Sequence, residues 1–212
     1  KQVLNWILQE YRSEKTVFGI PQEKFYAKQD TAAMRVFGEL CETPIGPAAG
    51  PHTQVAQNIA AAYLAGGRFF ELKTVQIMDE LEIPRPCIDM EDEGYNVEWS
   101  QELKLEQSLE EYVKASMLIE ILRRWEPLAD HVGSDPGPHV FDMSVGYDLD
   151  GIRRSNMQWF LDKAENAGPD LDATVDIVGR RFPAVFDHPV PACISDNVTL
   201  STMHGCPPDE IG

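Results

Sequence analysis

The sequence predicts an α/β fold built on parallel strands. Segments with the apolar pattern of strands alternate with amphipathic helical segments along the 212 residues, which is the order found in α/β proteins. One early stretch contains a strand, a small-residue loop, a helix and a second strand, at the length that a right-handed parallel crossover requires. Three predicted strands also end in loops with unusual small or polar residues, where α/β folds bind their ligands.

The beginning of the chain predicts a helical arm before the first strand. Residues 3–11 carry apolar side chains at helical spacing, at Leu4, Ile7, Leu8 and Tyr11. A polar stretch without a clear pattern follows, and residues 31–37 predict a short helix that Gly38 ends. We therefore expect residues 1–36 to form an amino-terminal helical arm.

The predicted crossover unit follows this arm. Residues 39–49 predict a short strand that runs into a loop of small residues, within the stretch 43-TPIGPAAGPHTQ-54. Residues 52–67 predict a helix with one apolar face, and its two final glycines are typical of a helix end. Residues 68–76 then predict a second strand, parallel to the first.

The rest of the chain continues the alternation of helices and strands. We predict an irregular acidic insertion over 77–100, a helix over 101–125, a loop over 126–139, a strand over 140–148, a helix over 155–168, and a strand that leads into a loop over 192–208. About four parallel strands are therefore expected in all.

Composition narrows the partners and the compartment. Hydrophobic residues make up 43% and charged residues 25%, as in soluble globular proteins, and the net charge is -17. Nucleic acids and anionic membrane surfaces repel an acidic protein, so neither is expected as a partner. The sequence has no apolar run long enough to span a bilayer, and its four cysteines form no CxxC pair. We expect a cytoplasmic protein with free thiols.

The two ends of the sequence predict a fragment of a longer protein. The chain begins without Met. The prolines and acidic residues of 206-CPPDEIG-212 suit the first turn of a helix that would continue further.

The small-residue loop is the first candidate site. Ala48, Ala49 and Gly50 would let a flat or phosphorylated ligand approach the backbone within van der Waals distance. The same composition also suits a tight turn packed beneath a helix. The stretch does not match GxGxxG, so a dinucleotide fingerprint is absent.

Lys73 is the second candidate, because it follows the residues FFEL near the carboxyl end of a predicted strand. A lysine there could neutralise an anionic cofactor or an electron-rich ring. It could also extend its ammonium group to water, or form a Schiff base in a lyase or aldolase. Ser144 and Tyr147, in DMSVGYD, mark the end of another strand, where Gly146 permits close approach.

Histidine and cysteine residues in the last part of the chain do not predict a metal site. Their spacing matches no common zinc pattern, at His188, Cys193, His204 and Cys206. Cys206 is instead a candidate proton donor or reactive thiol at a strand end, a role that would require a lowered thiol pKa.

Several phrases resemble known flavoprotein sequences. The stretch FGELCETPIGPAAGPHTQVAQNIAAAYLAGGRFFELKTVQ resembles the opening of the FMN barrel in dihydroorotate and dihydropyrimidine dehydrogenases, and DMSVGYD followed by a helix ending in AENAG resembles the next strand–helix unit. The phrases CETPIGPAAGPHTQ, DEGYNVEWS, MSVGYDLDGI and TLSTMHGCPPDEI resemble the amino-terminal part of a selenate reductase subunit. That family consists of large bacterial iron–sulfur flavoproteins similar to dihydropyrimidine dehydrogenase.

This resemblance implies a partial TIM-type (β/α) barrel that contains about the first four strands. Residues 37–212 would form the first half of a flavin-type barrel, truncated at its carboxyl end, with FMN at the carboxyl ends of the strands. The backbone of Ala48, Ala49 and Gly50 would line the flavin. Lys73 would approach the ring and favour negative charge on its reduced form.

The resemblance also implies roles for further residues. Thr74 would lie beside the flavin, Asn96 would correspond to an asparagine of the second strand–helix loop, and Ser144 would end the third strand. Cys206 would be the catalytic residue, as a proton donor.

The resemblance finally implies the setting of the domain. The parent protein would transfer electrons to or from a small reducible substrate, and its iron–sulfur clusters and an FAD or NADPH site would lie in other domains or subunits. The chain departs from the dehydrogenases over residues 200–207, where their Asn-Leu-Ser-Cys-Pro is replaced by LSTMHGCP, without an asparagine at the expected place. An alternative is therefore a degenerate barrel that serves as a scaffold without FMN.

Overall fold

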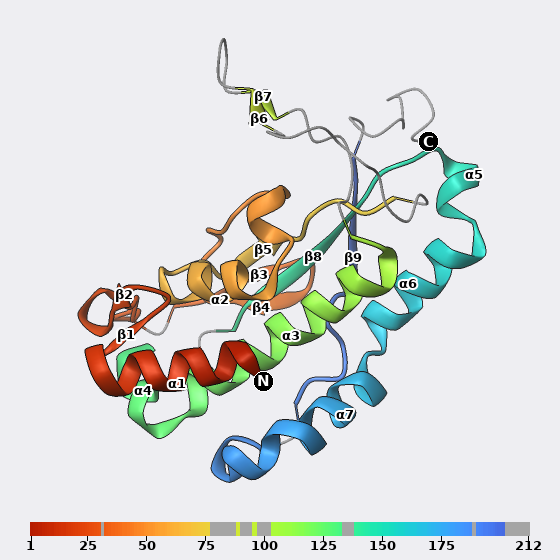
Figure 1. Cartoon of the computed structure of the whole chain (residues 1–212). Helices are drawn as coiled ribbons and strands as arrows, with labels where there is room; N and C mark the ends of the chain where they lie inside the picture. Colours follow the sequence, from red (N-terminus) through yellow and green to blue (C-terminus); the bar gives the residue numbers. More distant parts are fainter. Residues whose placement is uncertain are drawn as a thin grey trace.

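A parallel β-sheet packed against helices forms the centre of the molecule (Figure 1). Among the described residues the sheet has the strands β5 Phe69–Glu71, β8 Val140–Val145 and β9 Asn197–Leu200, and β8 pairs in parallel with both neighbours. The computed structural model describes residues 1–30, 32–76, 88–89, 95–96, 103–132, 138–187 and 190–201.

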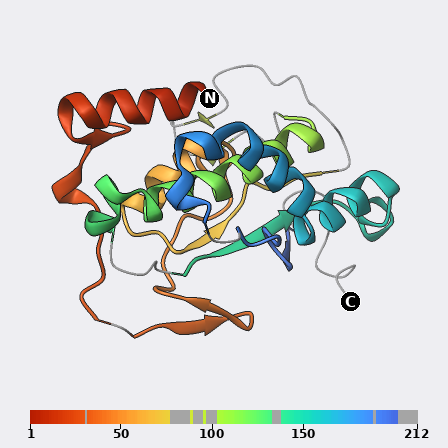
Figure 2. The ribbon, with the colours of Figure 1, turned by 90° about the horizontal axis from the view of Figure 1, so that it is seen from below.

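Helices pack on one face of the sheet. They are α2 Ala56–Leu64, α3 Leu105–Arg124 and α6 Ser155–Glu165, and Figure 2 shows them stacked over the strands. In the chain, α3 lies between β5 and β8, α6 lies between β8 and β9, and α2 precedes β5. Strands that follow one another in the sheet also follow one another along the chain, with helices between them. This is the arrangement of the first part of a (β/α) barrel, so the predicted α/β fold class is confirmed.

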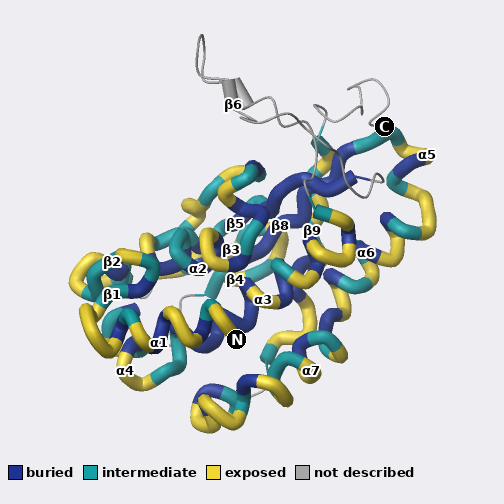
Figure 3. The backbone as a smooth tube through the Cα atoms, viewed as in Figure 1, coloured by how far each residue is buried: buried dark blue, intermediate teal, exposed yellow. Residues whose placement is uncertain are grey.

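The central strand explains why the sheet forms here. All six residues of β8, Val140–Val145, are buried (Figure 3). Strands of parallel sheets are covered on both faces and are therefore rich in apolar residues. Two polar residues interrupt the apolar pattern of β8, at Asp142 and Ser144. They are two positions apart and therefore lie on the same face of the sheet.

The position of the first barrel strand is occupied by residues 45–47. The carbonyl of Ile45 accepts hydrogen bonds from the backbone N–H groups of Arg68 and Phe69, and the carbonyl of Pro47 accepts one from Glu71. Because proline has no N–H group, Pro44 and Pro47 cannot complete a regular ladder. The segment predicted as a strand over 39–49 therefore lies beside β5 only in its second half.

The first half of that segment belongs to an antiparallel hairpin. β3 Met34–Val36 pairs with β4 Glu39–Cys41 through a two-residue turn at Phe37 and Gly38, whose φ angles are 50° and 87°. Such positive φ values are typical of tight hairpin turns. The helix predicted over 31–37 is therefore wrong for its described residues. The predicted boundary between the amino-terminal arm and the barrel, after residue 36, lies at the start of this turn and stays a prediction.

The amino-terminal arm contains the predicted helix. α1 Gln2–Glu14 buries the four apolar residues that predicted it, so this helix is confirmed. A small hairpin of β1 Thr16–Val17 and β2 Ile20–Pro21 follows, then the short helix η1 Gln22–Lys24. The carboxylate of Glu10 accepts hydrogen bonds from Thr16 Oγ1 and from the N–H groups of Phe18 and Gly19, which fixes the hairpin turn.

Several short elements escaped prediction. α4 Glu126–Val132 occupies part of the predicted loop over 126–139, so that prediction is wrong for these residues. The other elements are η2 Pro51–Thr53, α5 Leu149–Ile152, α7 Gly168–Val178, η3 Gly179–Arg181, η4 Pro183–Val185, and the antiparallel pair of β6 Ile88–Asp89 with β7 Tyr95–Asn96. The helices predicted over 52–67, 101–125 and 155–168 are confirmed, with later starts or earlier ends.

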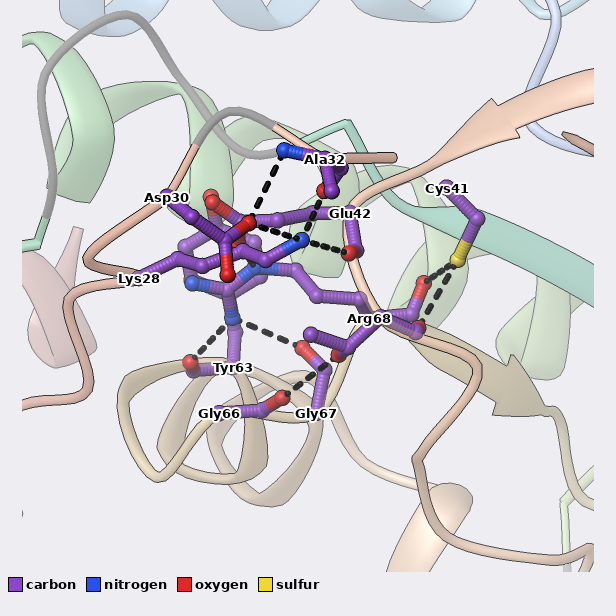
Figure 4. A network of polar contacts seen from close by, with 10 residues as sticks. Lys28, Asp30, Ala32, Cys41, Glu42, Tyr63, Gly66, Gly67 and Arg68 are labelled. Atoms are coloured by element: carbon purple, nitrogen blue, oxygen red, sulfur yellow. Dashed lines mark hydrogen bonds and ion pairs between the residues drawn. The ribbon is translucent and has the colours of Figure 1, made fainter. Parts of the chain in front are cut away.

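A buried arginine holds the end of the sheet where β5 begins (Figure 4). Arg68 is 0% exposed, and its Nε atom lies 2.6 Å from a carboxylate oxygen of Glu42. Its Nη1 donates to the carbonyls of Tyr63 and Gly67, and its guanidinium lies 3.9 Å from the centre of the Tyr63 ring. The backbone carbonyl of Glu42 in turn accepts from Lys28 Nζ at 2.9 Å. Arg68 therefore joins α2, β5 and the segment before the small-residue loop.

A histidine at the same end should make the stability of the domain depend on pH. The His139 ring packs edge-on against Tyr63, Phe70 and Phe141. Burial, followed by the positive charges of Arg123 and Arg68, lowers the pKa of His139 to about 3. The unfolded chain binds a proton at this histidine below its usual pKa of about 6.5, whereas the folded chain does not.

Stability should therefore fall as the pH drops from about 6.5 toward 3, by up to about 1.4 kcal/mol per unit from this group. Replacing His139 with phenylalanine should flatten that part of the profile. Chemical unfolding of both proteins between pH 4 and pH 8 measures the difference. A parallel pair of profiles would show that His139 is already protonated in the folded chain.

Candidate functional site

Polar side chains gather where the parallel strands end. Six of these side chains are buried although they are polar, and each is at most 6% exposed: Thr53, Gln54, Lys73, Thr74, Gln76 and Ser144. They come from the loop before α2, from the residues after β5, and from β8. Buried polar groups need partners, so such a cluster indicates a built site.

An extra residue at the end of β5 shapes this site. Glu71 pairs with Asp142, yet the next bridge joins Val75 to Val145, so four steps along one strand match three along its neighbour. This is the pattern of a β-bulge, which redirects side chains next to active sites. In a regular ladder Lys73 would stand opposite Ser144. With the bulge, Thr74 takes that place, and its Oγ1 lies 2.9 Å from Ser144 Oγ.

Lys73 is held within the protein at this bulge. It is 3% exposed, and its Nζ donates to the carbonyl of Thr74 at 3.2 Å. Its backbone N–H donates to the carbonyl of Thr53, and its own carbonyl accepts from the hydroxyl of Tyr112 on α3 at 2.9 Å. Burial raises the pKa of Tyr112 strongly, so this hydroxyl keeps its proton and remains a donor. The alternative that Lys73 extends to water is wrong for this structure.

The small-residue loop is closed by its own hydrogen bonds. Thr53 Oγ1 lies 3.1 Å from both the N–H and the carbonyl of Gly50, and the N–H of Ala49 donates to a carboxylate oxygen of Glu71 at 2.9 Å. Gly50 has an extended backbone, so its φ angle does not require glycine. Ala48 is exposed. The loop therefore presents small side chains on a backbone that is fixed from beneath.

One glycine of the loop is required by packing. A Cβ atom added to Gly46 would lie 1.4 Å from the carbonyl oxygen of Phe69. No side chain fits in that space, because the obstacle is backbone. Gly46 is therefore explained by close packing against strand β5, rather than by the predicted alternative of a turn packed beneath a helix. This packing does not explain the small size of Ala48 and Ala49.

The structure brings five of the predicted site residues to this end of the sheet. Ala49, Gly50, Lys73, Thr74 and Ser144 are linked there by the hydrogen bonds given above, and Ala48 adjoins them in the chain. The backbone of Asn96 lies in β7, paired with Ile88, and its side chain is outside the described part of the structure. Cys206 lies outside the described residues, so its predicted role stays a prediction.

Sequence reasoning missed an acidic pair beneath the loop. Asp142 is 2% exposed and stands in register with Glu71 on the neighbouring strand. Burial raises the pKa of Asp142, a hydrogen bond from Thr199 lowers it, and the negative charge of Glu71 raises it again. The second oxygen of Asp142, Oδ1, finds no hydrogen-bond partner among the described residues. The signal in the sequence was a charged residue within an otherwise apolar strand.

The donor set suits a flat ligand that carries negative charge. It combines the buried Lys73 side chain, the hydroxyl pair of Thr74 and Ser144, and a loop of small residues whose Ala49 and Gly50 N–H groups donate to Glu71 and Thr53. A lysine in a site with little water stabilises negative charge better than the same group in solution. Within the described residues no group of three or more histidine, cysteine or acidic residues is placed to hold a metal ion.

Together these features define a class of protein, a TIM-type barrel domain with a buried polar cluster at the carboxyl ends of its strands. A family model described as "Oxidoreductase YgfK, N-terminal TIM-barrel domain" matches residues 18–212. The chain belongs to this family, and the predicted partial TIM-type barrel is confirmed by it.

The curated relatives that the chain matches are longer proteins. The chain is 42% identical to "Putative oxidoreductase YgfK" of Escherichia coli K12 over 232 aligned residues, which cover 100% of this chain and 22% of that protein. The protein of the same name from Escherichia coli O157:H7 matches equally. The chain thus spans about a fifth of these relatives. No solved structure matches it. None of the helices in the described part is long and apolar enough to cross a membrane.

Proposed function

We propose that this domain holds FMN at the carboxyl ends of its strands, as part of a flavin-dependent iron–sulfur oxidoreductase. The observation that carries this proposal is the buried Lys73, which is tied through its backbone to the small-residue loop and is followed at once by the Thr74–Ser144 pair. Membership in an oxidoreductase family supports the reaction class. The phrases shared with a selenate reductase subunit support the cofactors.

In this proposal the full-length protein works in the cytoplasm and transfers electrons to or from a small reducible substrate. Iron–sulfur clusters and an FAD or NADPH site lie in its other domains or in other subunits of a redox complex. The phosphate of FMN would bind in the later half of the barrel, because TIM-type barrels usually hold phosphate after their seventh and eighth strands.

The residues of this chain would hold and tune the cofactor. FMN, when bound, supplies hydride and single-electron chemistry. The ammonium group of Lys73 favours negative charge at this end of the sheet, and burial limits screening of that charge by water. The hydroxyl of Tyr112 holds the Lys73 carbonyl from α3 and thus fixes the strand end. One of the Thr74 and Ser144 hydroxyls donates to the other, so the pair has at most one hydroxyl proton left for a ligand.

Replacing Lys73 with alanine should weaken FMN binding about tenfold, since roughly 1.4 kcal/mol of charge stabilisation is lost. It should also lower the flavin midpoint potential by about 30 mV, because the reduced anion loses its positive neighbour. The measurement is flavin content, followed by a redox titration of the full-length protein. Lys114→Ala on α3 is the control, because that side chain is 51% exposed and pairs with Glu110 and Glu111. Equal values for both variants would contradict the proposed role.

A scaffold role without FMN is the second candidate. The internal hydrogen bonds of the site favour it, because Thr74 and Ser144 bond to each other and Lys73 Nζ bonds to the Thr74 carbonyl. The visible absorption spectrum of the full-length protein separates the two functions. Flavin bands with FMN released on denaturation support the flavin site. If the full-length protein contains no FMN, the scaffold role is supported instead. Borohydride trapping with a carbonyl substrate tests the remaining alternative, a Schiff base formed on Lys73.

A further inference from the structure

One acidic residue joins the small-residue loop to β5 at two points. The backbone N–H of Glu71 donates to the carbonyl of Pro47 at 3.2 Å, and a carboxylate oxygen of Glu71 accepts from the N–H of Ala49 at 2.9 Å. The loop is therefore held at two residues that are separated by Ala48. A bond from an N–H group to a carboxylate is stronger than one to a neutral acceptor.

The far end of the loop is held by the same strand. The backbone N–H of Lys73 donates to the carbonyl of Thr53, and Thr53 Oγ1 accepts from the N–H of Gly50. Residues 71 and 73 thus hold the two ends of a loop that runs from Pro47 to Thr53. Any shift of the loop relative to Lys73 must break at least one of these contacts.

The carboxylate of Glu71 is a costly choice for purely structural work. It stands in register with the buried Asp142, and its negative charge helps to raise the pKa of that residue. Like charges on neighbouring strands are destabilising. Natural sequences keep such local conflicts mostly at functional sites. An amide oxygen could accept the same hydrogen bond without the repulsion, which provides a conservative replacement for a test.

We propose that Glu71 is a positioning residue of the flavin site. It fixes the position of the Ala48–Gly50 backbone relative to Lys73, so that the loop and the lysine contact the same flavin ring. This inference rests on the proposed function, because it assigns Glu71 to the geometry of that cofactor site. Glu71 touches the loop and is not a catalytic residue.

Three variants of the full-length protein test this assignment. Glu71→Met keeps the length of the side chain and removes the acceptor, whereas Glu71→Gln keeps an acceptor oxygen. Glu39→Met is the matched control, because Glu39 is another partly buried acidic residue that accepts a hydrogen bond, from Asn197 Nδ2 at 2.7 Å, and does not contact the loop. Each protein is examined by amide hydrogen exchange over residues 45–55 and over β8, and by titration with FMN after removal of bound flavin.

We expect Glu71→Met to speed exchange in the loop about tenfold while β8 is unchanged, since only the local opening energy falls. FMN should dissociate about tenfold more readily from this variant, whereas Glu71→Gln should restore both values and Glu39→Met should change neither. If loop exchange in Glu71→Met equals that of the wild type, the Glu71 carboxylate does not hold the loop, and the inference fails. Faster exchange with unchanged FMN affinity would overturn the positioning role.

The test also separates the two proposals. If the wild-type protein binds no FMN, the proposed function fails, and the positioning role fails with it. The exchange data then still decide whether Glu71 holds the loop. If FMN binds and Glu71→Gln is as weak as Glu71→Met, the negative charge rather than the hydrogen bond is what matters, which overturns the inference as stated.

Discussion

Replacing Arg68 with methionine should destabilise the domain by about 3–5 kcal/mol, the usual cost of removing one partner of a buried ion pair. Methionine fills much of the same volume, so the loss comes from polar groups. The carboxylate of Glu42 loses its partner, and the carbonyls of Tyr63 and Gly67 lose a donor. Chemical unfolding, with the midpoint and slope fitted for each variant, measures the effect.

Two further variants make this result interpretable. Arg35→Met is the control, because Arg35 is exposed in the hairpin, where its Nη1 donates to the carbonyl of Gly38. It should change stability by less than about 0.5 kcal/mol. The double variant Arg68→Met with Glu42→Met should recover part of the loss, since no charge is left unpaired. Equal stability of Arg68→Met and Arg35→Met would show that the buried pair is not needed.

Replacing Gly46 with alanine should have a comparable effect by a different route. The added Cβ would need the space of the Phe69 carbonyl oxygen, 1.4 Å away, so the loop and β5 must move apart. We expect a loss of roughly 3 kcal/mol or more, at the upper end of overpacking effects. If the domain holds FMN as proposed, its FMN content should fall in parallel, because the hydrogen bonds that Ile45 and Pro47 accept from β5 would be broken.

Gly168→Ala is the matched control for this change. A Cβ atom there would make ordinary contacts, at 3.5 Å from Ala192 and Asn166, at the start of α7. Alanine is also the better helix residue, so stability should be unchanged or slightly higher. Thermal unfolding of the two variants compares the same chemical change in two surroundings. A Gly46→Ala protein as stable as Gly168→Ala would mean that the loop does not pack against β5 as described.

The regular part of the fold could be predicted because periodicity reports burial. Helices α1, α3 and α6 have apolar stripes, and β8 is an apolar run of the length of a strand. The hairpin of β3 and β4 was missed because its turn is Phe37-Gly38 rather than a common turn pair such as Asn-Gly. α4 was missed because a short helix is stabilised by packing that a local pattern does not contain. α7 is as long as α6 but buries only Leu171 and Val178, so it has no complete apolar stripe.

The candidate site could be predicted only as far as strand ends are visible in a sequence. Lys73, Thr74 and Ser144 were placed correctly at the carboxyl ends of the strands. Their mutual geometry depends on the bulge after Glu71, which arises from pairing with a distant strand. The hydrogen bond from Ala49 to Glu71 and the burial of Asp142 likewise depend on neighbours in space, so the spacing of residues along the chain could not indicate them.

The bulge also affects how related sequences should be aligned. A relative with one residue fewer between positions 71 and 75 would have a regular strand there, and its lysine would stand where Thr74 stands in this protein. An aligned lysine would then not show that two proteins share this site, because the lysine side chain would point in another direction. The length of this short segment, rather than the residues within it, is therefore the feature by which relatives with the same strand-end geometry can be recognised in genomes.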